Sequence, residues 1–192
     1  AGNVISTSGY FWANGVAYAT SSGGGSSLAN VTLNGVVATL QPGVNQLNNF
    51  IMGWYSDDFE MCDRIIDAHK QSPNKRPGIF GTSKFYNKTV KDSYDMMWQP
   101  GEVPDYYLEH INKCLDLYLA KHEYAVLDSG LELAEQTQVQ YYPPGGGYKA
   151  WHMERAGLNW PVVTRYLVFM TYLNTVTDGG GTEFFYQGVK TQ

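Results

Sequence analysis

The first 56 residues of this 192-residue chain contain no Asp, Glu, Lys, Arg or His. All 31 formal charges, 13 from Lys and Arg plus 18 from Asp and Glu, follow Ser56. The surface of an ordinary globular domain carries interspersed charges of both signs. The charge-free stretch is therefore not typical of an independent domain with a solvated surface. On this ground we divide the chain into an uncharged segment, residues 1–47, and a globular unit, residues 48–192.

Short β-like runs lie on both sides of a flexible connector in the uncharged segment. The runs are NVIST, GYFWANGVAYA and NVTLNGVVATL, and the connector is SSGGGSS. Asn14–Gly15 and Asn34–Gly35 are hairpin-turn signals, because such turns need residues that tolerate positive φ angles. A disordered polar leader is the alternative interpretation of this composition.

The stretch GNVISTSGYFWANGVAYA resembles the uncharged, Gly-, Asn- and Thr-rich modules of bacteriophage tail-fibre and other virion proteins. The resemblance implies a β-rich attachment segment over residues 1–47. Its aromatic side chains would be buried against other copies of the chain, in a homo-oligomer, or against virion partner chains. The location that this implies is the virion or the host cytoplasm.

Charge and hydropathy exclude two classes of partner. The formal net charge of −5 argues against nucleic-acid binding through a basic surface. The longest apolar stretch near the C-terminus, YLVFMTYL, is shorter than the ~20 residues that a membrane-spanning helix needs. Cys62 and Cys114 match no CxxC spacing, so we interpret them as buried free thiols rather than as a disulfide or zinc ligands.

Helical periodicity predicts two amphipathic helices, over residues 57–70 and 104–121. After Gly130 the pattern changes to strands, which we expect over residues 137–142, 148–155, 164–174 and 182–186. Helices followed by a run of strands with Gly- and Pro-rich turns favour an α+β unit that ends in a β-sandwich or barrel.

A histidine and a glutamate stand two residues apart in YYPPGGGYKAWHMER, residues 141–155. In a strand, residues two apart point to the same face, so His152 and Glu154 would face the same way. In a helix the two side chains would diverge by roughly 200°. The extended conformation alone therefore lets this imidazole and carboxylate reach one metal ion.

Three blocks, QVQYYPPGGGYKAWHMER, TRYLVFMTYLNTV and DGGGTEF, together resemble the iron(II)/2-oxoglutarate-dependent dioxygenases of the prolyl 4-hydroxylase-like branch. The matching residues are Tyr142, Tyr148, His152, Glu154, Tyr172, Leu173, Asn174 and Gly180 through Phe184. The resemblance extends over residues 48–192. It implies a double-stranded β-helix, or jelly roll, with an outer N-terminal helical layer.

The resemblance also implies a site. In this family two imidazoles and one carboxylate hold Fe(II), which leaves coordination positions for 2-oxoglutarate and O2. His152 and Glu154 would be metal ligands, and Tyr142 and Tyr172 would donate hydrogen bonds to 2-oxoglutarate. Arg165 would contact substrate or cosubstrate. The alternatives are that the tyrosines fill the core and that Arg165 forms a surface salt bridge.

The chain departs from the family pattern in two ways. Glu154 stands where most relatives have Asp, and no histidine follows His152 to serve as the second iron ligand. Lys190 comes too early to be the basic residue that pairs with 2-oxoglutarate. We therefore expect a jelly roll that is incomplete at its C-terminus, inactive as given, and exposed at Val168, Met170 and Phe184. With its start at Ala1, the chain is interpreted as a piece of a longer product.

Two functions follow from these patterns. The first is a 2-oxoglutarate- and Fe(II)-dependent hydroxylase-like domain that acts on a protein, a peptide or an amino-acid side chain. The alternative is a structural virion protein, of a tail fibre or appendage, that carries an inactive or incomplete oxygenase-like domain.

Overall fold

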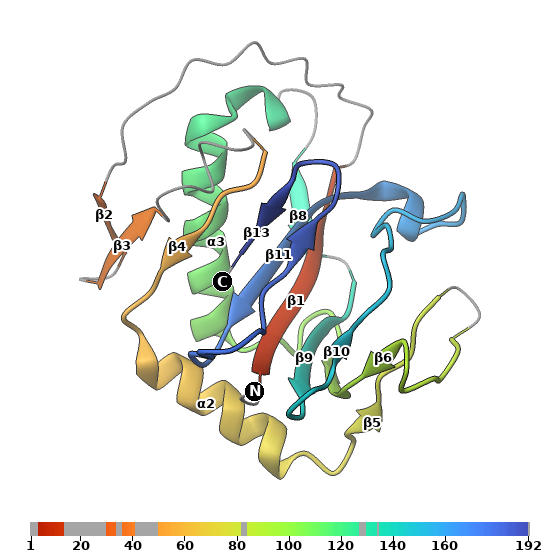
Figure 1. The fold of residues 1–192 in the computed structure, drawn as a ribbon. Helices are drawn as coiled ribbons and strands as arrows, with labels where there is room; N and C mark the ends of the chain where they lie inside the picture. Colours follow the sequence, from red (N-terminus) through yellow and green to blue (C-terminus); the bar gives the residue numbers. More distant parts are fainter. Residues whose placement is uncertain are drawn as a thin grey trace.

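The computed structural model describes residues 4–13, 30–33, 36–40, 50–81, 84–126, 130–133 and 135–191. Its centre is a six-stranded antiparallel sheet in the order β11-β1-β9-β7-β5, with β8 paired to β1 (Figure 1). The strands of this sheet are β1 Val4–Ala13, β5 Arg76–Pro77, β7 Tyr94–Trp98, β8 Leu131–Leu133, β9 Thr137–Tyr142 and β11 Arg165–Tyr172.

The other elements of the described residues are two helices, two short 3-10 turns and three small sheets. The helices and turns are α2 Phe59–Gln71, α3 Asp105–Lys121, η1 Glu123–Val126 and η2 Val162–Thr164. The small sheets pair β2 Asn30–Leu33 with β3 Val36–Leu40 and β4 Trp54–Tyr55, β6 Lys91–Asp92 with β10 Gly147–Tyr148, and β12 Glu183–Phe184 with β13 Val189–Lys190.

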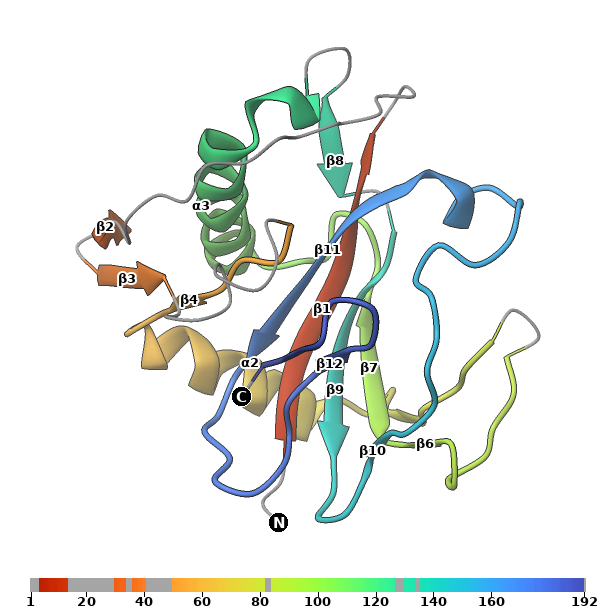
Figure 2. The same cartoon turned by 45° about the horizontal axis from the view of Figure 1, so that its top comes forward.

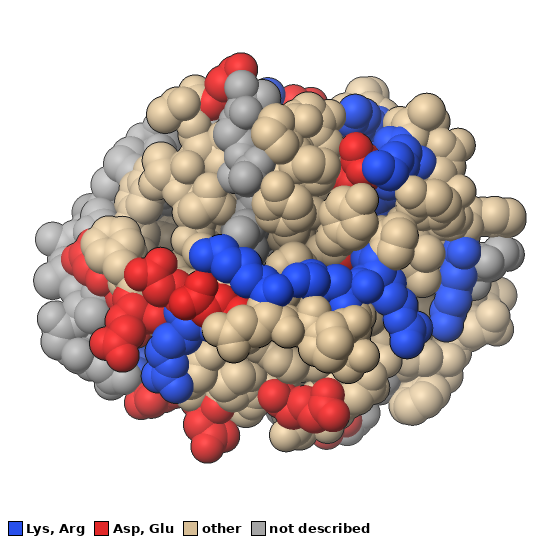
Figure 3. Space-filling view, turned by 90° about the horizontal axis from the view of Figure 1, so that it is seen from below, with Lys and Arg blue, Asp and Glu red and all other residues tan. Residues whose placement is uncertain are grey.

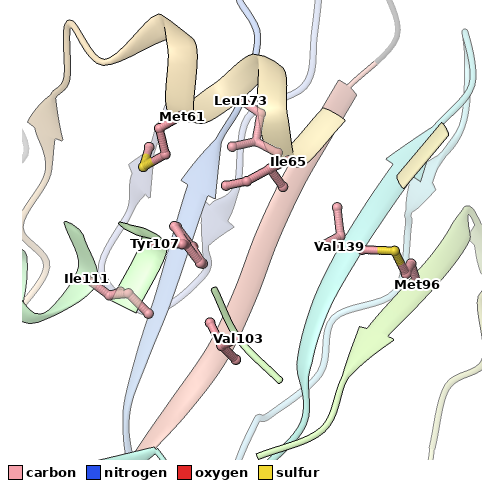
Figure 4. Packing of buried hydrophobic residues seen from close by; sticks show 8 residues of the cluster. All are labelled: Met61, Ile65, Met96, Val103, Tyr107, Ile111, Val139 and Leu173. Atoms are coloured by element: carbon pink, nitrogen blue, oxygen red, sulfur yellow. The ribbon is translucent and has the colours of Figure 1, made fainter. Parts of the chain in front are cut away.

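The hydrophobic core lies between the helices and one face of the central sheet (Figure 4). Its buried members are Met61 and Ile65 from α2, Tyr107 and Ile111 from α3, Met96 from β7, Val139 from β9, and the flanking Val103 and Leu173. The members from each helix are four positions apart, which places them on one face. The apolar residues that recur at helical spacing in the sequence therefore contribute to the helix faces that pack against the sheet.

The opposite face of β11 is exposed. Along this strand Leu167 and Phe169 pack against the core, whereas Val168 and Met170 are 49% and 43% exposed. This alternation follows from the pleat of a strand, which points successive side chains to opposite faces. The expected exposure of Val168 and Met170 is confirmed, but Phe184 is half-buried. The face of the sheet away from the helices is thus open to solvent at β11.

The N-terminal strand β1 lies inside the central sheet, between β9 and β11. Ser8 pairs with Gln138 on one side and with Met170 on the other. In addition, β3 pairs with β4, so Thr39 lies opposite Tyr55. Both pairings cross the predicted boundary at residue 47, so β1 and β3 are paired with strands of residues 48–192. The division of the chain into two domains at that boundary stays a prediction. The strand β2 pairs with β3, and residues 1–3, 14–29, 34–35 and 41–47 lie outside the described residues.

The α+β class is confirmed, as are both predicted helices and the strand over residues 137–142. The predicted strand over 148–155 is wrong in its extent: only Gly147–Tyr148 pairs, with β6, and the residues that follow form neither strand nor helix. None of the described helices is long and apolar enough to cross a membrane. On the face seen from below in Figure 3, a narrow row of Lys and Arg is bordered by Asp and Glu, so the charge there is mixed.

Protonation of His69 is expected to make stability depend on pH. This side chain of α2 is 4% exposed, and its Nε2 lies 2.9 Å from the carbonyl oxygen of Tyr94. Burial lowers the pKa of His69 from 6.5, against a smaller opposite effect of the hydrogen bond to Tyr94. The unfolded chain then binds more protons than the folded chain between the two pKa values, so this contribution raises the free energy of unfolding as pH rises.

Urea unfolding of the protein between about pH 5 and pH 7.5 tests this expectation. We expect His69→Gln, which keeps a donor for Tyr94, to weaken the pH dependence. His110, whose pKa burial also lowers, contributes with the same sign, and His152, whose pKa is raised, contributes with the opposite sign. Only the difference between variant and wild type therefore isolates His69, and equal pH dependences would contradict the assignment.

Candidate metal-binding site

The Pro- and Gly-rich turn after β9 leads the chain into the candidate site. The N–H of Gly146 donates to the carbonyl oxygen of Pro143 at 2.7 Å, and β10 then pairs with β6. A Cβ atom on Gly146 would lie 2.8 Å from the backbone oxygen of Asp92, closer than side-chain carbons approach. Glycine is therefore required where the turn meets β6. From β10 the chain rises along the sheet to η2 at its upper end (Figure 2).

His152 and Glu154 converge on this rising segment. The ring of His152 stacks on the ring of Tyr148, with centroids 4.0 Å apart and an angle of 13° between the planes. Its Nδ1 lies 3.0 Å from the carbonyl oxygen of Ala150, and its Nε2 lies 3.1 Å from Oε1 of Glu154. The two side chains are 38% and 40% exposed, so the point where they meet is reachable from solvent.

Both ring nitrogens of His152 thus face oxygen atoms. A neutral imidazole donates from one nitrogen only, so it cannot donate to both oxygens at once. The hydrogen bond to Glu154 raises the pKa of His152, burial lowers it, and the carbonyl of Ala150 and the charge of Glu154 raise it further. A positive charge at Nε2, carried by a proton or by a metal ion, lets both ring nitrogens interact favourably with the oxygen atoms that they face.

Arg165 lies next to Glu154, and its guanidinium is already engaged in hydrogen bonds. Its guanidinium donates to both carboxylate oxygens of Glu135 and to the backbone oxygen of Glu154. These contacts agree with the alternative interpretation, in which Arg165 forms a salt bridge. A contact between Arg165 and a cosubstrate stays a prediction.

The two predicted tyrosines differ in what their hydroxyls contact. The hydroxyl of Tyr172 lies 2.5 Å from Oγ1 of Thr182 and 3.2 Å from Oγ1 of Thr191. Tyr142 forms no side-chain hydrogen bond with the residues that the structure describes. Burial raises the pKa of Tyr142, and the nearby Asp95 and Glu154 raise it further. The hydroxyl of Tyr142 is thus buried, and no side-chain hydrogen bond to it is formed within the described residues.

A buried ion pair lies beside these residues. Nζ of Lys91 donates to Oδ2 of Asp95 at 2.8 Å, and Oγ of Ser93 donates to Oδ1 of Asp95 at 2.8 Å. Lys91 and Asp95 are only 4% and 3% exposed, and Nζ lies 5.7 Å from the centre of the Tyr148 ring. Sequence reasoning missed this pair. Its signal was the alternation in KDSYD, which puts residues 91, 93 and 95 on one face of an extended chain.

Lys91→Met is expected to lower the free energy of unfolding by about 3–5 kcal/mol, because it leaves the carboxylate of Asp95 buried without its counter-ion. Thermal and urea unfolding measure the change. The exposed pair of Lys70 and Asp67 on α2 provides the control, since Lys70→Met should cost at most about 1 kcal/mol. Similar effects of the two substitutions would show that burial of the Lys91 pair does not matter.

The other histidines lie away from His152. His69 faces β7, and His122 packs between Phe50 and Tyr118 at the end of α3. Within the described residues no group of three or more His, Cys, Asp or Glu side chains is arranged to hold a metal ion. Within the described residues, His152 and Glu154 are therefore two candidate ligands and not part of a larger group of this kind. Glu135, Lys91 and Asp95 are the neighbouring residues that the sequence did not single out.

No protein-family model, curated protein or solved structure matches this chain.

Proposed function

We propose that this chain is a 2-oxoglutarate- and Fe(II)-dependent hydroxylase-like domain, a partial double-stranded β-helix that acts on a protein, a peptide or an amino-acid side chain. The observation that carries the proposal is the distance of 3.1 Å between Nε2 of His152 and Oε1 of Glu154. Two donors that bind a metal at about 2.1 Å along perpendicular directions lie about 3 Å apart. The pair fits a shared metal ion in donor type and spacing.

The surrounding residues fit the roles that the proposal needs. With its Nδ1–H donating to Ala150, His152 offers the lone pair of Nε2 to a metal. Glu154 supplies negative charge, and the hydroxyl of Tyr142 can donate to a carboxylate oxygen of 2-oxoglutarate. Bound iron with its cosubstrate would supply the oxidising chemistry, and the protein would orient the reactants. To donate to the cosubstrate directly, the hydroxyl of Tyr172 would have to give up its hydrogen bonds with Thr182 and Thr191. Otherwise these two threonines would lie between Tyr172 and the cosubstrate.

Two protein ligands are one fewer than a facial triad uses. We therefore expect residues 1–192 to bind divalent metal weakly and to produce no succinate. Anaerobic titration with Fe(II) and 2-oxoglutarate, followed by admission of O2, measures both properties. Tight iron binding together with succinate formation would show that another residue completes the site and that the expected inactivity is wrong.

Paramagnetic broadening by Mn(II) tests the location of the site at low affinity. The NMR signals of His152 and its neighbours should broaden at low Mn(II) concentrations, whereas those of the buried His69 should not. If His152 is unaffected while other positions broaden, the proposed metal site is wrong.

The second candidate is a structural virion protein that carries an inactive oxygenase-like domain, located in the virion or the host cytoplasm. It is supported by the uncharged first 56 residues, and among the described residues no group of three His, Cys, Asp or Glu side chains is placed to hold a metal ion. Sedimentation velocity distinguishes this candidate: a stable homo-oligomer without metal binding at His152 supports it, and a monomer that binds metal contradicts it.

A further inference from the structure

Arg165 and Glu135 form a bidentate ion pair close to the candidate metal site. Nε and Nη2 of Arg165 each donate to one carboxylate oxygen of Glu135 at 2.7 Å. The side chains are 19% and 13% exposed, so solvent screens this pair less than the surface pairs of the protein. Two parallel hydrogen bonds fix the plane of the guanidinium as well as its position.

The third nitrogen of this guanidinium points to Glu154. Nη1 donates to the backbone oxygen of Glu154 at 2.7 Å and lies 3.8 Å from its Oε2. The other carboxylate oxygen, Oε1, faces Nε2 of His152. The guanidinium therefore holds the main chain of Glu154 and attracts the carboxylate oxygen that is not engaged by His152.

The same ion pair links the two strands that flank β1. Arg165 begins β11 and pairs with Trp12 on one side of β1, and Glu132 of β8 pairs with Trp12 on the other. Glu135 follows two residues after β8 ends. The Arg165–Glu135 ion pair thus connects β11 to the segment that follows β8, and these two strands pair with opposite sides of β1 near its C-terminal end.

We propose that Glu135 and Arg165 are a positioning pair that holds Glu154 toward His152 and couples the N-terminal strand to the site. The metal-binding part of this inference rests on the proposed function. The part that concerns the pairing of His152 with Glu154 in the metal-free protein does not rest on the proposed function. Lysine cannot replace Arg165, because one ammonium group cannot reproduce the planar arrangement of three donor nitrogens that bond Glu135 and Glu154.

The test uses Arg165→Lys and Glu135→Gln in the complete 192-residue chain, with Asp67→Asn on α2 as a matched loss of one exposed ion pair. In metal-free protein at fixed pH, the ring-nitrogen shifts of His152 should move toward those of Glu154→Gln in both variants and stay unchanged in the control. Amide exchange near Trp12 should become faster in both variants. Mn(II) affinity at His152 should fall about tenfold to a hundredfold, as for other residues that orient metal ligands.

The outcomes separate the two proposals. Unchanged His152 shifts and unchanged exchange at β1 in both folded variants would overturn the positioning pair, whatever the metal result. Wild-type protein without Mn(II) broadening at His152, but with the expected shifts in the variants, would leave the positioning pair standing and overturn the proposed function. If Arg165→Lys does not fold, Glu135→Gln carries the decision, because it keeps the size of the side chain and removes only its charge.

Discussion

Deletion of residues 1–13 is expected to abolish cooperative folding. In the structure β1 separates β9 from β11 and pairs with both, so its removal leaves two strand edges unpaired in the middle of the sheet. Buried backbone groups without partners cost about 1–3 kcal/mol each, and a whole domain is stable by only roughly 5–15 kcal/mol. The expected result is the loss of the thermal unfolding transition, measured by circular dichroism and calorimetry, together with aggregation.

Single proline substitutions refine this experiment. Ser8→Pro removes a backbone donor from the centre of β1 and should be strongly destabilising, because proline is tolerated only at sheet edges, strand starts and bulges. Gly2→Pro, which precedes the strand, is the control and should melt like wild type. A truncated chain that melts normally would show that residues 14–192 fold without β1, as a separate N-terminal segment would require.

Glu154→Ala is expected to abolish metal binding at His152 and, in any form of the protein that turns over 2-oxoglutarate, to abolish turnover. The substitution removes the only anionic ligand of the proposed site. Changes to residues that merely orient a ligand already weaken metal binding by about tenfold to a hundredfold, so loss of the ligand itself should exceed that range. Metal titration and succinate formation are the two measurements.

Glu183→Ala is the matched control for this substitution, because Glu183 forms an exposed ion pair with Lys190. It should leave metal binding unchanged. Retained 2-oxoglutarate decarboxylation in Glu154→Ala would refute the assignment of Glu154 as a ligand. Glu154→Asp provides a further comparison, since the side chain shorter by one methylene must be repositioned to reach Nε2 of His152.

The helices, the strand over residues 137–142 and the approach of His152 to Glu154 could be predicted from the sequence. Each depends on a local pattern: apolar spacing every three to four residues, alternation along a strand, or two side chains on one face of an extended chain. The strand over 148–155 was predicted too long, because after Tyr148 the chain leaves β6. The two side chains nevertheless converge, with Nε2 of His152 3.1 Å from Oε1 of Glu154, in a segment that forms no strand pairing.

The position of β1 could not be read from composition. An uncharged strand with two neighbours in a sheet needs no charged surface of its own, so the absence of charge has two explanations. One is a surface covered by other chains, as the resemblance to virion modules implied. The other is a strand placed inside the chain's own sheet, and only the pairing of Ser8 with Gln138 and Met170 distinguishes them.

The sequence by itself determined the α+β class, the two helices and the two donors of the candidate site, because these follow from periodicities within a few residues. The tertiary structure alone decided where β1 lies, why Arg165 engages Glu135 and Glu154, and that Lys91 is buried with Asp95. Those features join strands that are distant along the chain or depend on which side chains lose water on folding. No local spacing encodes which of many distant partners a backbone edge or a charged side chain will meet.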